Sequence, residues 1–250
     1  LKTEGRGVTH VSQHLHMTHW AAERTMDFLT HERDPDKPFF CMMSVFEPHN
    51  PYEHYPKEMG RLVDREAIPP PTPRGPGLEP ADIARERHEN YFADFDSLSA
   101  DEIATMRHGY HASVAYGDLE FGRVLDALGL AEETLVIFTS DHGDMLGDHD
   151  LMVKGAFFYD PNVRVPLMMR WPQGFDGGRR VAGLVQLHDL AATILRAAEV
   201  TETEIARGMP DACDLLPLAK GAAHEVHDAV YCDYRNSGMC AGHTYWDPPI

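Results

Sequence analysis

Residues 139–155 gather side chains whose types and spacing are suited to chemistry. Asp141 offers a carboxylate oxygen and His142 an imidazole nitrogen, and divalent cations accept both as ligands. Lys154 brings a compact positive charge back to the same region, which suits an anionic oxygen. The pattern predicts a site where a metal cation and a lysine share an anion. The alternative is an acidic, solvated loop with no chemical role.

This stretch follows directly from an apolar run at residues 134–139, which predicts a buried strand. In parallel α/β sheets, ligands bind beyond the carboxyl ends of the strands. Gly143 and Gly147 allow the backbone to turn tightly, so that polar groups can converge. Asp144 and Asp148 are expected to act as hydrogen-bond acceptors that organise the loop.

Hydrophobic periodicity predicts helices and short strands in alternation. The expected helices cover residues 18–29, 103–128 and 187–198, and a capping box of Ser99 and Glu102 opens the second of them. The expected buried strands cover residues 39–45, 134–139, 165–171 and 229–232. This alternation predicts an α/β fold, with a mostly parallel central sheet and helices on both of its faces.

The domain organisation is expected to be simple. Residues 1–205 form the main α/β domain, and residues 206–250 begin a smaller C-terminal subdomain. Residues 46–98 contain many prolines and little periodicity, which predicts a long loop insertion. The first residues show no signal-peptide pattern and the last show no closing helix or strand, so both ends are interpreted as cut edges.

Composition excludes several classes of partner. The 250 residues are 43% hydrophobic and 25% charged, as in soluble globular proteins. The net charge of −18 argues against general binding of nucleic acid or of anionic membranes. No apolar run approaches the ~20 residues of a membrane span. The cysteines lack CxxC spacing and are expected to be buried or incidental thiols: Cys41, Cys213, Cys232 and Cys240.

A series of segments, in one order, resembles the sulfatase family of the alkaline-phosphatase-like superfamily. The likeness runs over roughly residues 15–235. It is carried by residues 39–44, Pro48-His49-Asn50-Pro51-Tyr52, residues 116–125, Ser140-Asp141-His142-Gly143, Gly147-Asp148-His149, Lys154-Gly155, residues 164–167, residues 187–195 and residues 215–218.

The resemblance implies hydrolysis of a small-molecule or carbohydrate sulfate ester. Asp141 and His142 match ligands of the active-site divalent cation, with calcium expected and manganese or magnesium as alternatives. Lys154 matches the lysine that binds the sulfuryl oxygens and steadies the leaving oxygen. His49 matches the histidine beside the scissile ester, where an imidazolium would protonate the departing alkoxide. Many sulfatases carry Asn where His142 stands, so a phosphonate or phosphate ester hydrolase is the alternative within the superfamily.

One part of the family pattern is absent. Sulfatases take their nucleophile from a Cys or Ser in a C-x-P-x-R sequence that is converted to formylglycine, and this chain contains no such sequence. The family's early Asp-Asp ligands are missing as well, which predicts a chain without the N-terminal nucleophile segment. Two protein ligands are too few to hold a hard cation tightly, so the chain alone is expected to be inactive. A non-catalytic module that only keeps the fold is the remaining alternative.

Overall fold

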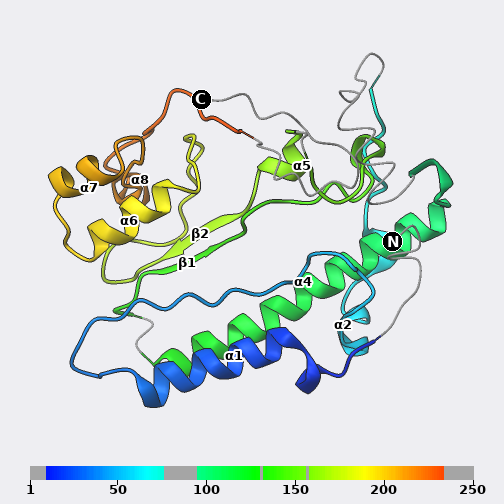
Figure 1. Ribbon diagram of the computed structural model, residues 1–250, viewed down its shortest axis with the longest axis horizontal. Coiled ribbons are helices and arrows are strands. Elements are labelled where there is room, and N and C mark those ends of the chain that lie inside the picture. The colour runs from blue at the N-terminus through cyan, green and yellow to red at the C-terminus, as the bar shows by residue number, and fades with distance from the viewer. Residues whose placement is uncertain (1–9, 76–94, 130–131, 156–157, 234–250) are drawn as a thin grey trace, which may run out of the picture. The chain divides into compact units, whose positions relative to one another are not determined.

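The computed structural model describes residues 10–75, 95–129, 132–155 and 158–233 (Figure 1). These residues form two compact units. The first unit comprises the described residues of 10–129 and 142–163, and the second those of 132–141 and 164–233. The domain boundary expected after residue 205 stays a prediction.

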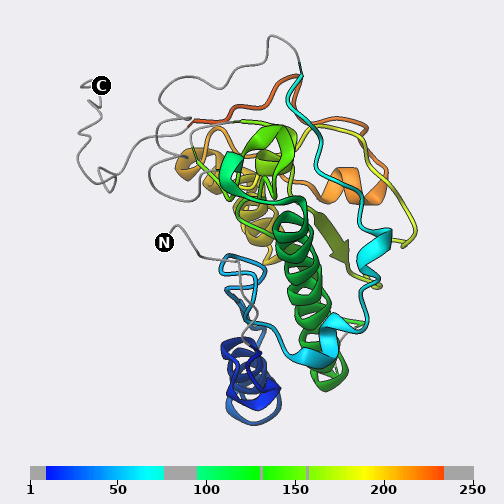
Figure 2. The same ribbon diagram turned by 90° about the vertical axis from the view of Figure 1, so that its right-hand side faces the viewer.

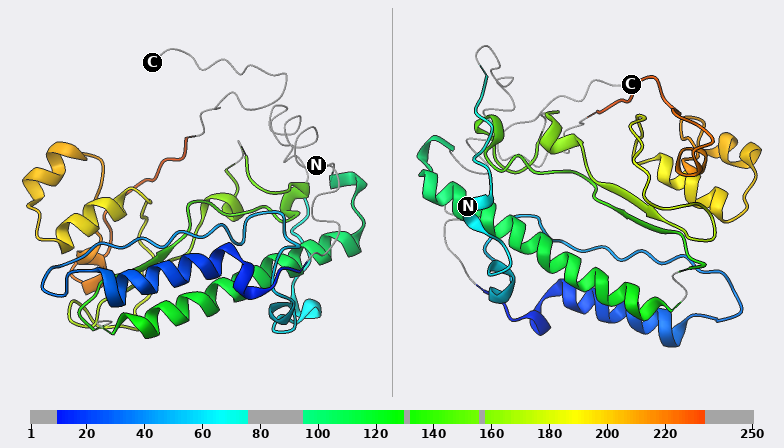
Figure 3. Two further views of the ribbon diagram at one scale, coloured as in Figure 1. Left: turned by 60° about the horizontal axis from the view of Figure 1, so that its bottom comes forward. Right: turned by 180° about the vertical axis from the view of Figure 1, so that it is seen from behind.

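Two helices organise the first unit. Helix α1 (Met17–Asp27) continues into the π-helical turn η2 (Phe28–Glu32) and packs along α4 (Ala100–Leu128), as two further views show (Figure 3). The predicted helices 18–29 and 103–128 are therefore confirmed. The short α2 (Lys57–Gly60) also packs on α4 (Figure 2). The other short elements among the described residues of this unit are η1 (Gln13–Leu15), η3 (Arg65–Ala67), η5 (Phe95–Ser97), η6 (Asp148–Asp150) and α5 (Asp160–Val163).

The ends of α4 have clear local causes. The Ser99 side chain accepts a hydrogen bond from the Glu102 amide at 3.2 Å, and the Glu102 carboxylate accepts one from the Ser99 amide at 2.8 Å. This reciprocal capping satisfies two amides of the first turn, as the sequence predicts. Gly129 ends the helix with a φ of 62°, in the left-handed region that favours glycine.

A buried carboxylate joins the two long helices. Glu120 of α4 is fully buried and accepts hydrogen bonds from Gln13 at 2.8 Å and Arg123 at 2.6 Å, with the His19 ring at 3.1 Å. Burial raises the pKa of Glu120, but these hydrogen bonds outweigh it and leave the pKa below its usual value. The helix pair is thus fixed by a satisfied polar network as well as by apolar packing.

The described residues of the second unit form one small sheet and three helices. Strands β1 (Val136–Thr139) and β2 (Leu167–Arg170) pair antiparallel, with Val136 opposite Arg170. Helix α6 (Asp189–Ala197) confirms the helix expected at 187–198, and α7 (Glu202–Gly208) and α8 (Leu216–Lys220) follow it. Thr193 of α6 accepts a hydrogen bond from the Leu215 amide at 2.9 Å, which ties α6 to the start of α8.

The predicted parallel sheet is not confirmed. Within the described residues the sheet has two strands, and they run antiparallel. The apolar runs at 39–45 and 229–232 form no strand there, although side-chain exposure alternates along 39–45 as in an extended chain. An apolar run specifies an extended backbone but not its neighbour, and a strand needs a paired neighbour.

The long loop is mostly irregular where it is described. Residues 46–75 contain only the single turns α2 and η3, and residues 76–94 of the predicted insertion lie outside the described residues. No helix in the described part of the chain combines the length and hydropathy that a membrane crossing requires.

Candidate active site

The loop after β1 is held by its own backbone and by two carboxylates. The Met145 amide donates to the Val153 carbonyl at 2.8 Å, which closes the loop at its base. Asp144 accepts a hydrogen bond from the Leu146 amide at 3.0 Å, and Asp148 accepts one from the Thr72 amide at 2.9 Å. The acceptor roles predicted for Asp144 and Asp148 are confirmed.

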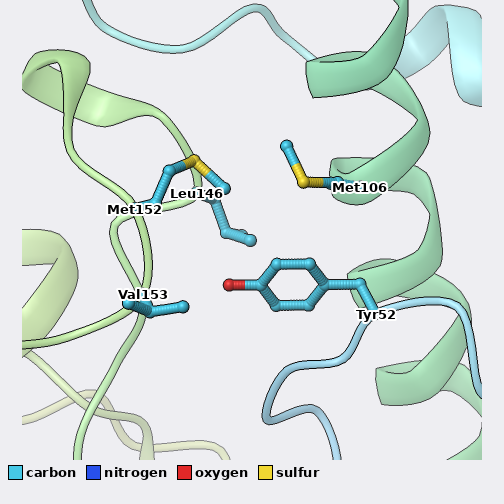
Figure 4. Packing of buried hydrophobic residues seen from close by; sticks show 5 residues of the cluster. All are labelled: Tyr52, Met106, Leu146, Met152 and Val153. Carbon is cyan, nitrogen blue, oxygen red and sulfur yellow. The ribbon is translucent and has the colours of Figure 1, made fainter. Parts of the chain in front are cut away.

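Tyr52 anchors the segment after His49 to this loop. Its buried ring lies among Met106 of α4 and the loop residues Leu146, Met152 and Val153 (Figure 4). Its hydroxyl donates to the Asp144 carboxylate at 2.7 Å. A buried aromatic ring with a satisfied hydroxyl fixes both segments at once.

This cluster brings His49 to Lys154, because Tyr52 follows His49 by three residues and Val153 immediately precedes Lys154. The Lys154 ammonium and His49 Nε2 lie in hydrogen-bond contact. His49 Nδ1 lies 2.6 Å from the Asn50 carbonyl oxygen, which can only accept, so Nδ1 carries the proton. Nε2 therefore holds the lone pair and accepts from Lys154. The Phe46 ring lies against the His49 ring, with centroids 4.4 Å apart.

Lys154 is partly buried, and burial lowers its pKa from the usual value. Water solvates the ammonium poorly there, so an anion beside it would recover part of the lost solvation energy. The positive charge of Lys154 thus favours an anionic ligand, although the chain as a whole is acidic.

His142 lies near the same pair. Its ring centroid is 6.2 Å from that of His49, and its Nδ1 lies 2.9 Å from the Gly143 carbonyl oxygen. The carbonyl accepts the Nδ1 proton, which leaves the lone pair on Nε2. A histidine held this way by its own backbone offers Nε2 to a divalent metal ion, although calcium and magnesium usually take oxygen ligands.

The structure therefore brings together His49, His142 and Lys154. Asp141 immediately precedes His142 in the chain but belongs to the second unit, where its side chain is exposed. Its role as a metal ligand stays a prediction.

Gly143 is required by a close backbone approach. A Cβ at this position would lie 1.8 Å from the Pro161 carbonyl oxygen, and the Gly143 amide donates to the Asn162 carbonyl at 2.8 Å. The sequence suggested a tight turn, and the structure shows contact with the start of α5 as the physical reason.

Replacing Gly143 with alanine is expected to destabilise the chain by about 1–3 kcal/mol, because backbone atoms must move apart to admit the methyl group. Urea unfolding measures the change. Gly122→Ala is the matched control, since a Cβ there meets nothing within 4 Å and α4 should gain about 0.5–1 kcal/mol. Equal stability of the two variants would contradict the close approach.

Tyr52 also controls the ionisation of Asp144. Burial raises the pKa of Asp144 to about 6, and the Tyr52 hydrogen bond partly counteracts this. The unfolded carboxyl titrates near 3.8, so the folded state binds this proton more tightly. The stability that Asp144 contributes is complete below pH 3.8 and is lost as pH rises through about 6.

Tyr52→Phe should therefore raise the Asp144 pKa further and cost about 1.5–3 kcal/mol at pH 8. The cost should be smaller at pH 5, where the carboxyl is mostly protonated in the folded state. Unfolding at both pH values tests this, with the exposed Tyr231→Phe as control. A loss that is identical at pH 5 and pH 8 would exclude the ionised hydrogen bond.

The sequence interpretation missed how the residues that support the site pair with one another. Tyr52 and Asp144 pair across 92 positions of the chain, which no local pattern reveals. Gly109 of α4 lets the Tyr52 carbonyl approach, because a Cβ there would lie 2.2 Å from that oxygen. A glycine inside a strongly helical pattern was the available signal.

Comparison with known proteins adds family evidence. Residues 9–200 match a family model described as Sulfatase. An arylsulfatase of Clostridium perfringens is 31% identical over 208 residues, covering 79% of this chain and 41% of the relative. Iduronate 2-sulfatase of Mus musculus is 35% identical over 167 residues, covering 61% of this chain and 30% of the relative.

A solved structure shares the architecture as well. The phosphonate monoester hydrolase SpPMH from Silicibacter pomeroyi superposes with a TM-score of 0.65 at 25% identity, covering 90% of this chain and 44% of that one. The chain thus spans less than half the length of each of these three proteins.

Proposed function

Because the chain belongs to the sulfatase family, we propose that the complete protein hydrolyses a sulfate ester. The observation that carries this proposal is the contact between the Lys154 ammonium and His49 Nε2. It places a cation and an imidazole side by side, the cation for the anionic oxygens of an ester and the imidazole, once protonated, for its leaving oxygen.

Lys154 binds the sulfuryl oxygens in this mechanism. An ester that enters between the two side chains takes the ammonium away from His49, and burial strengthens its attraction for the anion. Charge that develops on the transferring group is then stabilised without reorganisation of solvent.

His49 protonates the leaving alcohol. Its Nδ1 proton is held by the Asn50 carbonyl, so the ring orientation is fixed. Once the ester has drawn the Lys154 ammonium away, Nε2 takes up a proton from solvent, and the resulting imidazolium delivers that proton to the leaving oxygen. The contact with Phe46 further restricts the ring. An alkoxide is a poor leaving group, so this proton transfer should matter most for alkyl esters.

Asp141 and His142 are the residues proposed to hold a divalent cation, with calcium expected and manganese or magnesium as alternatives. When bound, the cation would act as a Lewis acid toward the sulfuryl oxygens. A formylglycine nucleophile is proposed to come from a segment outside this chain, since no Cys- or Ser-x-Pro-x-Arg sequence occurs in it.

A small-molecule or carbohydrate sulfate ester is the proposed substrate class. The similarity to an iduronate 2-sulfatase supports the carbohydrate form. An anionic substrate approaches a chain of net charge −18, so the local cations must supply the attraction.

Metal binding provides the first test. Calorimetric titration of the complete protein with calcium and with manganese should show binding. Asp141→Ala should raise the dissociation constant by roughly tenfold or more, because one charged ligand is lost. Asp160→Ala, with an exposed carboxylate on α5, is the control. Unchanged binding in Asp141→Ala would remove Asp141 from the site, and no binding in any variant would favour a non-catalytic module.

A phosphonate or phosphate ester hydrolase is the second candidate, supported by the structural match to a phosphonate monoester hydrolase. Assays of paired aryl sulfate, aryl phosphate and aryl phosphonate esters separate the two. A higher kcat/KM for the sulfate ester supports the sulfatase proposal, and a higher value for a phosphorus ester replaces it.

A further inference from the structure

The second unit holds a cluster of metal-binding side chains that the proposed reaction does not use. Asp189, Cys213 and His227 place one ligand atom each within 4.8 Å of one another. Within the described residues, no other group of three His, Cys, Asp or Glu side chains meets this distance. The sequence suggested only a buried or incidental thiol for Cys213.

Asp189 fixes the backbone of the cluster. It is the first residue of α6 and is fully buried. Its carboxylate accepts hydrogen bonds from the Gln186 amide at 2.7 Å and from the Cys213 amide at 2.9 Å. The position of Cys213 is therefore set by the same carboxylate that starts the helix.

The same carboxylate orients His227. His227 Nε2 lies 2.9 Å from one Asp189 oxygen and 3.1 Å from the other. A carboxylate oxygen only accepts, so Nε2 carries the proton and Nδ1 holds the lone pair. Metal-binding histidines are commonly held through their second nitrogen by a carboxylate in this way.

The lone pair of His227 faces the thiol. His227 Nδ1 lies 3.9 Å from Cys213 Sγ. Two such ligands on one tetrahedral zinc ion, with bonds of about 2.1 and 2.3 Å, would lie roughly 3.6 Å apart. The two atoms are thus within a few tenths of an ångström of the separation that a shared metal requires.

The cluster also has the right chemistry. Zinc binds thiolate sulfur and imidazole nitrogen well, whereas calcium and magnesium bind mainly oxygen ligands. Both side chains are partly exposed, so an ion can reach them. Burial and the Asp189 carboxylate raise the pKa of the Cys213 thiol, so the side chain is protonated until a metal displaces the proton.

We infer that Cys213 Sγ and His227 Nδ1 bind a zinc-like, thiophilic divalent cation, with Asp189 as the residue that positions His227. The remaining coordination positions are open to water or to another ligand. This site lies wholly within the second unit and is independent of the proposed ester hydrolysis.

Cobalt(II) is the probe, because a cobalt–thiolate bond gives a near-ultraviolet charge-transfer band that oxygen and nitrogen ligands do not. The starting protein for this test, called the parent, has the substitutions Cys41→Ser, Cys232→Ser and Cys240→Ser. Cys213 is then the only cysteine left among residues 1–250. Titration should produce the band with saturation at one equivalent, and zinc should abolish it. Cys213→Ser should remove the band completely.

Two further variants separate a metal site from a reactive thiol. His227→Gln should weaken cobalt binding at least tenfold, whereas His224→Gln should leave it unchanged. His224 is a matched control, since it lies three residues before His227 and its side chain is exposed. A folded parent without the band, or a band of equal affinity in His227→Gln, would overturn the inference. Far-ultraviolet circular dichroism of each variant shows that it is folded.

Discussion

Lys154→Ala in the complete protein is expected to lower kcat for a sulfate ester by about 10²- to 10³-fold. The ammonium is partly buried beside His49, so no mobile solvent cation can take its place on the anionic oxygens. Lys154→Arg should restore little, because a planar guanidinium does not fit a position shaped for a compact ammonium. Steady-state kinetics of an aryl sulfate measure the effect.

Lys57→Ala is the matched control for this experiment. Lys57 lies on α2 with an exposed side chain, so its loss should leave kcat unchanged. If Lys154→Ala raised KM but kept kcat, the lysine would contribute equally to ground-state and transition-state binding, and its proposed role would be wrong.

His49→Gln is expected to affect esters according to their leaving groups. For an alkyl sulfate, kcat should fall by about 10²- to 10⁴-fold, because the departing alkoxide needs a proton. For a 4-nitrophenyl sulfate the loss should be far smaller, because that phenolate departs without one. The slope of log kcat against leaving-group pKa should become steeper in the variant.

His54→Gln controls for the removal of an imidazole from the same segment, since the His54 side chain is exposed. The hydrogen bond between His16 and His54 uses the His54 backbone carbonyl, which this substitution keeps. It should leave both rates unchanged. An equal loss for alkyl and aryl esters in His49→Gln would assign His49 to binding rather than to proton transfer.

The local elements could be predicted from the sequence because their causes are local. Helix α4 has a capping box at Ser99 and a left-handed glycine at its end, and β1 lies in an apolar run. Strand pairing is not local. Nothing within residues 165–171 indicates that β2 would pair antiparallel with β1, so the strand could be predicted and its antiparallel pairing could not.

For the candidate site too, the residues within one loop could be predicted, whereas the contacts between distant segments could not. His142 and Lys154 were found because both lie in one loop after β1, and His49 was found through the family resemblance. The contacts that support them connect distant segments. Tyr52 reaches Asp144, and Gly109 gives room for the Tyr52 carbonyl. Their partners depend on tertiary packing, which one sequence without its fold does not contain.

The extended segment at residues 39–46 has a consequence for handling the protein. Phe40, Met42 and Phe46 are 67%, 76% and 55% exposed, on alternate positions of a run that forms no strand in the described part of the chain. Such a run presents apolar side chains and backbone groups to any neighbouring copy. We therefore expect concentrated samples of the chain to self-associate, and we expect Met42→Lys to reduce this association.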